Sequence, residues 1–322
     1  MAVGIIAYGT YVPRYRIRAS EYVKALGSFA ARGISEKTVP DFDEDTITMA
    51  REAARGLDLS GVLSLALATT VPPYDQKVLA GTLAEMLGLG PRIFATEHTS
   101  SDRCGTEALL ASSRGLDGRG LVLVAGAPRG GVREETEHGA GAGAVALVIG
   151  EEDVFCEIEG WSAYVEEALG VDFRPAGADR RHDLGLGTYS RELMFHCVRQ
   201  AVSDLMTKLG TEPGHYAFAV LPGGDGRTPA ALGKGLGFEA ERVRNPVATL
   251  GDLGPATVFF GLAEALAQAR PGDRILLASY GAGSGSDAIS LKVRSERGPV
   301  TSAVEDVEYL DFLSYLKMRR LL

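Results

Sequence analysis

The chain has 322 residues, enough for one large domain or two fused domains. Its hydrophobic content of 45% and charged content of 23% are ordinary for a globular protein. A net charge of −9 argues against nucleic acid as a main partner, because phosphate binding needs clustered Lys and Arg. A small anionic ligand is not excluded, since one local group of cations is enough to bind it.

The three cysteines, Cys104, Cys156 and Cys197, form no Cys-x-x-Cys pair. Neither a zinc site nor a disulfide framework is indicated, and we expect no metal. The apolar start of the chain is followed by Pro13 and basic residues, the reverse of the order in a signal peptide. No apolar run approaches the roughly 20 residues of a membrane span. We therefore expect a soluble cytoplasmic protein with no membrane or nucleic-acid partner.

Apolar runs typical of strands alternate with segments of helical spacing along the whole chain. In chain order, the first part predicts a strand at Val3–Ala7, a helix at Glu44–Leu57, a strand at Val62–Ala68, a helix at Lys77–Leu87, a strand at Ile93–Thr96, a helix at Asp102–Leu116, and strands at Leu121–Ala125 and Ala144–Ile149. The second part predicts a strand at Phe155–Tyr164, a helix at Arg191–Leu209, a strand at Tyr216–Leu221, helices at Pro229–Leu236 and Ala256–Ala269, and strands at Ile275–Ser279 and Ala288–Val293. This alternation predicts an α/β fold with buried sheets.

A faint internal repeat divides the chain. The stretch from His138 to Ile149 is similar to the stretch from Tyr280 to Leu291, and each is a glycine-rich turn that leads into a strand. The offset between them is close to half the chain, which predicts two similar halves, residues 1–151 and 152–322. The second half would end in a tail from about residue 294 to residue 322. Glycine-rich turns before strands are common, so the repeat alone leaves coincidence open.

The most informative stretch runs from Thr99 to Leu109 and reads as a strand end, a sharp turn and a helix start. Its surroundings resemble the nucleophile elbow of 3-hydroxy-3-methylglutaryl-CoA (HMG-CoA) synthases. In that family the reactive cysteine stands three residues before a Gly-Thr pair. Counting back from Gly105 and Thr106 puts Asp102 in that place, with Cys104 two residues further on. The chain thus has the frame of the family but not its nucleophile.

Other motifs extend this resemblance to the archaeal-type branch of the thiolase superfamily over the whole chain. They follow one another in the family's order: Val3–Ile17, Asp43–Ala54, Gly139–Gly150, Ser279–Asp287 and Tyr315–Arg320. The resemblance implies a thiolase-like five-layered α-β-α-β-α fold, built from two pseudo-symmetric halves, and a dimer.

The three other catalytic positions that the resemblance implies are also changed. The family's glutamate falls on Thr70, within Thr69–Tyr74. Its histidine falls on Pro222 and its asparagine on Asp252. In the family the cysteine takes the acyl group, the glutamate moves a proton, and the histidine and asparagine polarise the acceptor. A chain with all four positions changed is not expected to condense acyl groups through a cysteine.

Asp102 and Cys104 each leave two interpretations open. Asp is among the best N-cap residues, so Asp102 could simply cap the helix that follows it. In a dry pocket, the same carboxyl would have a raised pKa and could act as an acid or base. Cys104 could be a small buried hydrophobic residue, or a nucleophile in a shifted register whose pKa the helix N-terminus lowers.

Several cations could bind the phosphates of coenzyme A (CoA), the ligand or substrate that the resemblance implies; no bound cofactor is expected. Arg227 stands at a family lysine that faces those phosphates, and Lys234 follows on the next helix. Arg14 and Arg16 lie in the N-terminal motif. All four could equally be solvated surface residues.

Three functional hypotheses follow. In the first, the chain is an acyl-CoA-binding subunit without the cysteine nucleophile. It would be a homodimer, or would pair with an active thiolase-fold protein or with the small OB-fold zinc-ribbon protein of similar synthases. In the second, it is a cysteine-independent enzyme that makes or breaks a C–C bond of an acyl-CoA, by retro-aldol or Claisen-type chemistry, with Asp102 as acid or base. In the third, it is an intact synthase that uses Cys104.

Overall fold

The strands form one long sheet and one small sheet in the computed structural model, which describes residues 2–115, 117–178, 181–182, 185–300 and 306–322. The first half of the chain contributes β1 (Gly4–Tyr11), β4 (Val62–Ala68), β5 (Phe94–His98), β6 (Arg119–Gly126) and β7 (Gly143–Gly150) to the long sheet. The second half contributes β8 (Cys156–Tyr164), β9 (Phe218–Val220), β10 (Val243–Arg244), β11 (Arg274–Ala278) and β12 (Ser286–Val293). The two sets meet through a short antiparallel pairing of β1 with β8.

The strand order of the long sheet is β10-β9-β11-β12-β8-β1-β7-β6-β4-β5. Its two halves mirror each other about the centre: β8 corresponds to β1, β12 to β7, β11 to β6, β9 to β4 and β10 to β5. In each half the first strand pairs antiparallel with the last, and the other neighbours have matching directions. The turn at Gly139 leads into β7 and the turn at Gly281 leads into β12, which are equivalent strands. The predicted equivalence of the two turns is therefore confirmed, and so are the two pseudo-symmetric halves. The division between residues 151 and 152 falls in the connection from β7 to β8 and stays a prediction.

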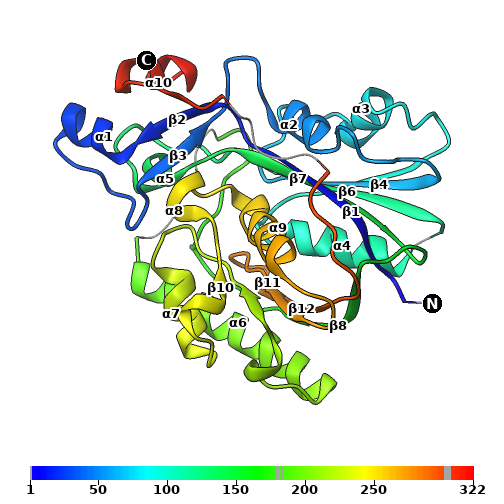
Figure 1. The fold of residues 1–322 in the computed structure, drawn as a ribbon. Coiled ribbons are helices and arrows are strands. Elements are labelled where there is room, and N and C mark those ends of the chain that lie inside the picture. The colour runs from blue at the N-terminus through cyan, green and yellow to red at the C-terminus, as the bar shows by residue number, and fades with distance from the viewer. Residues whose placement is uncertain (1, 116, 179–180, 183–184, 301–305) are drawn as a thin grey trace.

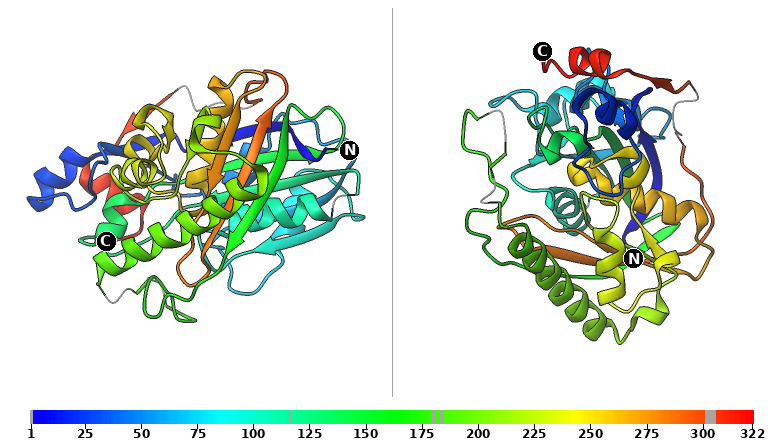
Figure 2. Two further views of the ribbon diagram at one scale, coloured as in Figure 1. Left: turned by 90° about the horizontal axis from the view of Figure 1, so that it is seen from below. Right: turned by 90° about the vertical axis from the view of Figure 1, so that its left-hand side faces the viewer.

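Helices lie in three layers around the two halves of the sheet (Figure 1). Helices α2 (Thr46–Ala53) and α3 (Leu79–Met86) cover the outer face of the first half. Helices α4 (Cys104–Arg114) and α9 (Thr257–Gln268) lie between the halves. Helices α6 (Gly187–Leu209) and α7 (Thr228–Gly235) cover the outer face of the second half, where α6 runs along β8 and β12 (Figure 2). This is the expected five-layered α-β-α-β-α fold.

Alternation along the strands explains the layers. In β7, Val145 and Leu147 pack in the central core, whereas Ala146 and Val148 pack in the outer core of the first half. In β11, Leu277 faces the central core and its neighbours face the outer core of the second half. Successive side chains of a strand point to opposite faces, and here both faces are covered by helices. The strands therefore read as continuous apolar runs.

A smaller unit lies beside the first half. Strands β13 (Glu308–Tyr309), β2 (Tyr15–Arg18) and β3 (Glu36–Val39) form a three-stranded sheet. Helices α1 (Ala19–Leu26) and α10 (Phe312–Met318) pack on it through one aromatic cluster, as their neighbouring positions in Figure 1 show. The remaining short helices are α5 (Glu135–Gly139) and α8 (Val247–Leu250). The C-terminal tail is thus joined to the N-terminal motif.

Among the described residues, no helix is long and apolar enough to cross a membrane.

Two local features position helices of the first half. Asp45 caps α2: its carboxylate accepts hydrogen bonds from the backbone N–H groups of Ile47 and Thr48 at 2.9 and 2.8 Å. Gly105 lies where α4 meets α9, and a Cβ there would stand 2.6 Å from a ring carbon of Phe259. Only glycine allows this approach of the two helices, so the Gly-Thr pair of the elbow has a packing role.

Candidate functional site

Asp102 lies in the turn between β5 and α4, at the carboxyl end of a parallel strand. Its Oδ1 is 3.4 Å from the hydroxyl of Thr70, which follows β4, and its Oδ2 is 3.5 Å from the guanidinium of Arg181. Both contacts are long for hydrogen bonds. Arg181 makes a shorter ion pair with Asp172, at 2.7 Å. The Asp102 carboxylate is therefore held loosely, with hydrogen-bonding capacity left over.

Two cavities meet at Asp102. One, of about 1380 Å³, is lined by Asp102, by Thr70 and by the long connection from β8 to α6. The other, of about 100 Å³, is lined by Asp102, Asp252 and Pro222, among others. The structure thus brings the four positions at which the resemblance places catalytic residues together around one place. The Asp102 side chain is 26% accessible and lines both cavities.

Burial raises the pKa of the Asp102 carboxyl above its ordinary value. The positive charge of Arg181 opposes this rise, and the negative charge of Asp252 adds to it. Thr70 favours the ionised form through its hydroxyl, but too weakly to reverse the effect. A carboxyl that keeps its proton nearer to neutral pH can act as a general acid or base.

Asp252 faces the same small cavity from the other half of the chain. Its Oδ1 accepts hydrogen bonds from the backbone N–H of Gly254 at 2.9 Å and from the hydroxyl of Thr257 at 3.1 Å. Pro222 follows β9 and lines the cavity with Gly223. Proline has no side-chain donor, so this position cannot polarise a carbonyl as a histidine would.

Asp102 does not cap α4, and the capping interpretation is wrong. The helix begins at Cys104, two residues later than predicted, and it has no side-chain cap. The predicted end of the helix, Leu116, lies outside the described residues. Because the polar contacts of Asp102 go to Thr70 and Arg181, its carboxylate is directed away from the first turn of the helix. Local helix chemistry therefore does not explain why an aspartate stands here.

Cys104 is fully buried in the central core and lines neither of the two cavities at Asp102. Burial raises the pKa of its thiol well above the ordinary value, and the negative charges of Asp102 and Glu107 add to the rise. A nucleophilic cysteine needs a lowered pKa and access to its substrate. The geometry favours the interpretation of Cys104 as a small hydrophobic residue.

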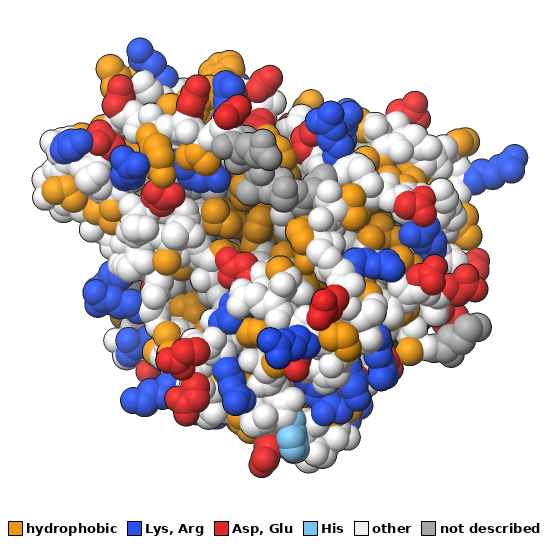
Figure 3. Space-filling view, in the orientation of Figure 1, with side chains coloured by type: hydrophobic (Ala, Val, Ile, Leu, Met, Phe, Trp, Pro, Cys, Tyr) orange, Lys and Arg blue, Asp and Glu red, His pale blue; other side chains and the backbone are white. Residues whose placement is uncertain are grey.

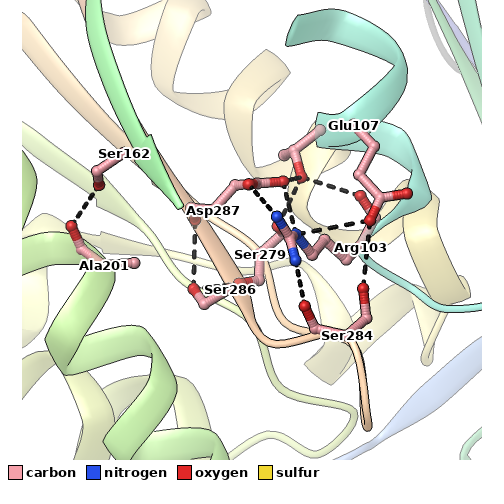
Figure 4. Close-up of polar contacts among 9 residues, drawn as sticks. Arg103, Glu107, Ser162, Ala201, Ser279, Ser284, Ser286 and Asp287 are labelled. Carbon is pink, nitrogen blue, oxygen red and sulfur yellow. Dashed lines mark hydrogen bonds and ion pairs between the residues drawn. The ribbon is translucent and has the colours of Figure 1, made fainter. Parts of the chain in front are cut away.

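A buried polar network fixes the first turn of α4. The guanidinium of Arg103 donates two hydrogen bonds to the carboxylate of Asp287, at 3.0 and 2.8 Å. Thr106 donates to the same carboxylate at 2.7 Å and contacts Ser279 at 2.6 Å. Figure 4 shows Arg103 and Glu107 reaching from α4 towards the glycine-rich turn that carries Ser284 and Asp287. The network joins the elbow of the first half to the start of β12 in the second half.

The four cations predicted for CoA binding do not line the large cavity. Arg16 is buried and donates to the backbone carbonyls of Pro13 and Tyr15. The geometry therefore favours a structural role for Arg16 over the predicted binding of phosphate. Arg14 pairs with Asp41. Arg227 and Lys234 are exposed at the two ends of α7, and Arg227 lies three residues after the loop that lines the small cavity. Arg227 and Lys234 stay candidates.

Five arginines of the large cavity were missed by sequence reasoning; they are Arg129, Arg174, Arg181, Arg319 and Arg320. Arg129 closely follows β6, and a cation after a parallel strand is a signal that could have been used. Arg174 and Arg181 lie in an irregular connection, where no periodicity marks them. On the face shown in Figure 3, Lys and Arg are interspersed with Asp and Glu rather than gathered into a basic surface. Among the described residues, no three His, Cys, Asp or Glu side chains gather as metal ligands.

Comparisons with known proteins agree with this geometry. The sequence is 31% identical to the hydroxymethylglutaryl-CoA synthase of Pyrobaculum neutrophilum, with 99% of this chain and 98% of the relative covered. It is 32% identical to the synthase of Methanopyrus kandleri, with 99% and 97% covered. The chain belongs to the hydroxymethylglutaryl-CoA synthase family. No family model matches the sequence.

Solved structures support the fold of this family member. An HMG-CoA synthase complexed with CoA has a TM-score of 0.83 at 18% identity, over 99% of this chain and 90% of the other. The 3-oxoacyl-[acyl-carrier-protein] synthase III of Aquifex aeolicus has a TM-score of 0.79 at 21% identity, over 90% and 99%. The family resemblance drawn from the motifs is confirmed. The assignment of individual catalytic positions to Asp102, Thr70, Pro222 and Asp252 stays a prediction.

Proposed function

We propose that this chain binds an acyl-CoA without forming an acyl-cysteine, and that it works as a subunit beside another protein. One observation carries the proposal: the elbow side chain that lines both cavities is the carboxylate of Asp102. Cys104, the nearest thiol in sequence, is buried in the core. A carboxylate at this place cannot take part in thiol–thioester exchange, so binding and covalent catalysis are separated.

Binding of CoA is supported by the family and by the solved relative that holds CoA. We propose Arg227 as the phosphate-binding cation, because it is exposed beside the loop of the small cavity. Calorimetry with CoA should show weak binding that falls as salt rises, since exposed charges are screened. Arg227→Glu should reduce binding more than Arg227→Lys does. Arg270→Glu, the same charge change in the exposed turn before β11, is the matched control.

Absence of CoA binding at low salt would overturn the acyl-CoA proposal. Equal losses in Arg227→Glu and Arg270→Glu would show a general effect of charge and remove Arg227 from the site.

A partner is supported by the edge of the long sheet. Within the part of the chain that the structure describes, β5 pairs with β4 alone and is the edge strand of the long sheet, so backbone groups on its other side are open to pairing. Phe94 on this strand is 72% exposed. An exposed edge strand with an aromatic residue can be extended by a strand of a second protein. We propose a second copy, or another thiolase-fold protein, at this edge; an OB-fold zinc-ribbon protein is the other candidate.

Light scattering tests the edge. The wild-type chain, alone or with its partner, should form a dimer that Phe94→Asp weakens by at least about tenfold in Kd, as expected for a central aromatic anchor. Leu63→Asp, at an exposed hydrophobic residue of β4, is the matched control. An unchanged assembly in Phe94→Asp would remove this edge from the interface.

A second candidate function is favoured by the raised pKa of Asp102. The chain would cleave or form a C–C bond of an acyl-CoA, with Asp102 moving the proton. Incubation with 3-hydroxyacyl-CoA thioesters, followed by chromatography, should then show release of a shorter acyl-CoA. Asp102→Asn should abolish turnover, because an amide cannot exchange the proton. Full turnover in this variant would remove Asp102 from the chemistry.

A further inference from the structure

The two halves of the chain bring two carboxylates to one small cavity. Asp102 lies two residues before α4 and Asp252 five residues before α9, and these are the two helices of the central layer. Gly254 lies between them: its N–H donates to Asp252 Oδ1 at 2.9 Å, and a Cβ on it would stand 3.2 Å from Asp102 Oδ1. Both carboxylates line the cavity of about 100 Å³.

Each carboxylate has an oxygen that can meet a ligand. Oδ1 of Asp252 is occupied by Gly254 and Thr257, whereas Oδ2 makes no hydrogen bond within the described part of the chain. A Cβ on Gly224 would stand 3.0 Å from this Oδ2, so the glycine leaves it uncovered. Among the described residues, the side chain of Asp102 makes two long polar contacts, to Thr70 and Arg181. Burying a polar atom without a hydrogen-bond partner destabilises the folded protein, so such an atom in a cavity suggests a bound ligand that supplies the partner.

We propose that Asp102 and Asp252 share one proton and act together as the acid and the base on a 3-hydroxyacyl thioester. This inference rests on the second candidate function and adds its second catalytic residue and its substrate class. Two carboxylates in one site cannot both ionise easily, because like charges repel. A 3-hydroxyacyl group suits the pair, since its hydroxyl donates to a carboxylate and its neighbouring carbon accepts a proton.

We assign the proton of the pair to Asp102. Burial and the charge of Asp252 both raise the pKa of the Asp102 carboxyl, and Arg181 lowers it. Arg181 also forms an ion pair with Asp172 at 2.7 Å, which weakens the effect of Arg181 on the pKa of Asp102. The thiol of Cys104 on the core side has a strongly raised pKa and stays uncharged. In the proposed pair, Asp102 is the donor and Asp252 is the acceptor.

The reaction balances without a further reagent. The carboxylate of Asp252 takes the proton of the substrate hydroxyl, whose oxygen forms a carbonyl as the C–C bond breaks. The electron pair of that bond passes to the carbon next to the thioester, which takes the proton of Asp102. The products are a carbonyl compound and a shorter acyl thioester. One proton still belongs to the pair, now on Asp252, and its return to Asp102 restores the starting state.

Infrared difference spectroscopy on the full chain tests proton sharing without any ligand. The carbonyl band of a protonated carboxylic acid should persist above the pH at which an ordinary aspartate ionises, and Asp102→Asn should remove this band. In Asp252→Asn the band should remain but titrate at lower pH, because the repelling charge is gone. Glu44, whose pKa burial also raises, is the control: Glu44→Gln should remove only its own band. A band unaffected by Asp252→Asn would overturn the shared proton.

Deuterium exchange into the carbon next to the thioester tests the chemistry. In D2O the wild-type chain should label a shorter acyl-CoA, and Asp102→Asn should slow labelling by at least about 100-fold, the usual size of acid–base catalysis. Asp252→Asn should slow the cleavage of a 3-hydroxyacyl-CoA by a similar factor, because Asp252 takes the proton of the hydroxyl. Cys104→Ala should label at the wild-type rate. Cleavage that stays at the wild-type rate in Asp252→Asn but is lost in Asp102→Asn would overturn the pair and leave Asp102 as the sole acid–base group.

Failure of the proposed function gives a different result. Calorimetry that finds no CoA binding to the wild-type chain, together with no labelling in any variant, would reject the acyl-CoA substrate and with it this inference. Binding of CoA with wild-type labelling absent would reject the acid–base pair alone.

Discussion

Asp102 and Arg103 are neighbours in sequence, but their surroundings are opposite. Arg103 is 7% exposed and its guanidinium is bound by Asp287 and by the carbonyl of Ser284 (Figure 4). Asp102 faces two cavities and has two polar contacts of 3.4 and 3.5 Å. One side chain is satisfied by the protein, and the other is not. The elbow thus combines a rigid support with a carboxylate that is left available.

The difference indicates that Arg103 has a structural role and that Asp102 is available for a functional one. A buried ion pair with short bidentate hydrogen bonds positions the backbone, and its removal should cost stability. A loosely held carboxylate in a cavity contributes little to stability, and its removal should affect ligands instead. The predictions below test that separation.

The largest expected effect concerns the support. Asp287→Ala leaves the guanidinium of Arg103 buried without its partner, and should lower the free energy of unfolding by about 3–5 kcal/mol. Urea denaturation followed by circular dichroism measures the change. Glu107→Ala is the matched control, because Glu107 is 3.6 Å from Arg103 and its side chain is 34% exposed. Its cost should stay below about 1 kcal/mol. Similar costs for the two variants would contradict a special role for the Asp287 pair.

An intermediate effect is expected at Cys104. Cys104→Ala removes a buried sulfur from the central core and should cost about 1 kcal/mol, similar to the loss of one buried methylene group. CoA binding measured by calorimetry should not change, since the side chain lines neither of the two cavities at Asp102. Loss of binding without loss of stability would place the thiol in the site after all.

The smallest effect on stability is expected at Asp102. The Asp102→Asn variant should differ from wild type by less than about 1 kcal/mol near pH 4, because the lost contacts are weak. The pKa of Asp102 is raised on folding, so its contribution is present below the unfolded pKa of about 3.9 and is lost as pH rises through the folded pKa. The variant should therefore gain stability relative to wild type as pH rises. Denaturation at several pH values checks this, and a difference that is constant with pH would contradict the raised pKa.

The strands could be predicted where both of their faces are buried, because their sequences are then continuous apolar runs. Strand β4 has its predicted bounds, and β7 differs by one residue at each end. Strands β2 and β3 and helix α10 were missed, because they are short and depend on contacts between the N-terminal and C-terminal segments. Contacts of that kind have no local periodicity to mark them.

Site residues could be predicted only where a recognisable motif fixed their positions in the sequence. The Gly-Thr pair located Asp102, and the structure places Thr70, Pro222 and Asp252 around the same cavities. Arg181 was missed because it lies in an irregular connection far along the chain. The capping interpretation of Asp102 failed because local propensity does not reveal that two cavities meet beside the turn.

Mass spectrometry of two forms of the chain after incubation with acetyl-CoA tests the central claim most directly. The wild-type chain should gain no acetyl group, because a carboxylate stands at the elbow and Cys104 is buried. Asp102→Cys places a thiol at the elbow, facing the cavities, and should gain one acetyl group, located by peptide mapping at position 102. An acetyl group on Cys104 of the wild-type chain would contradict the account and establish a synthase that uses this cysteine.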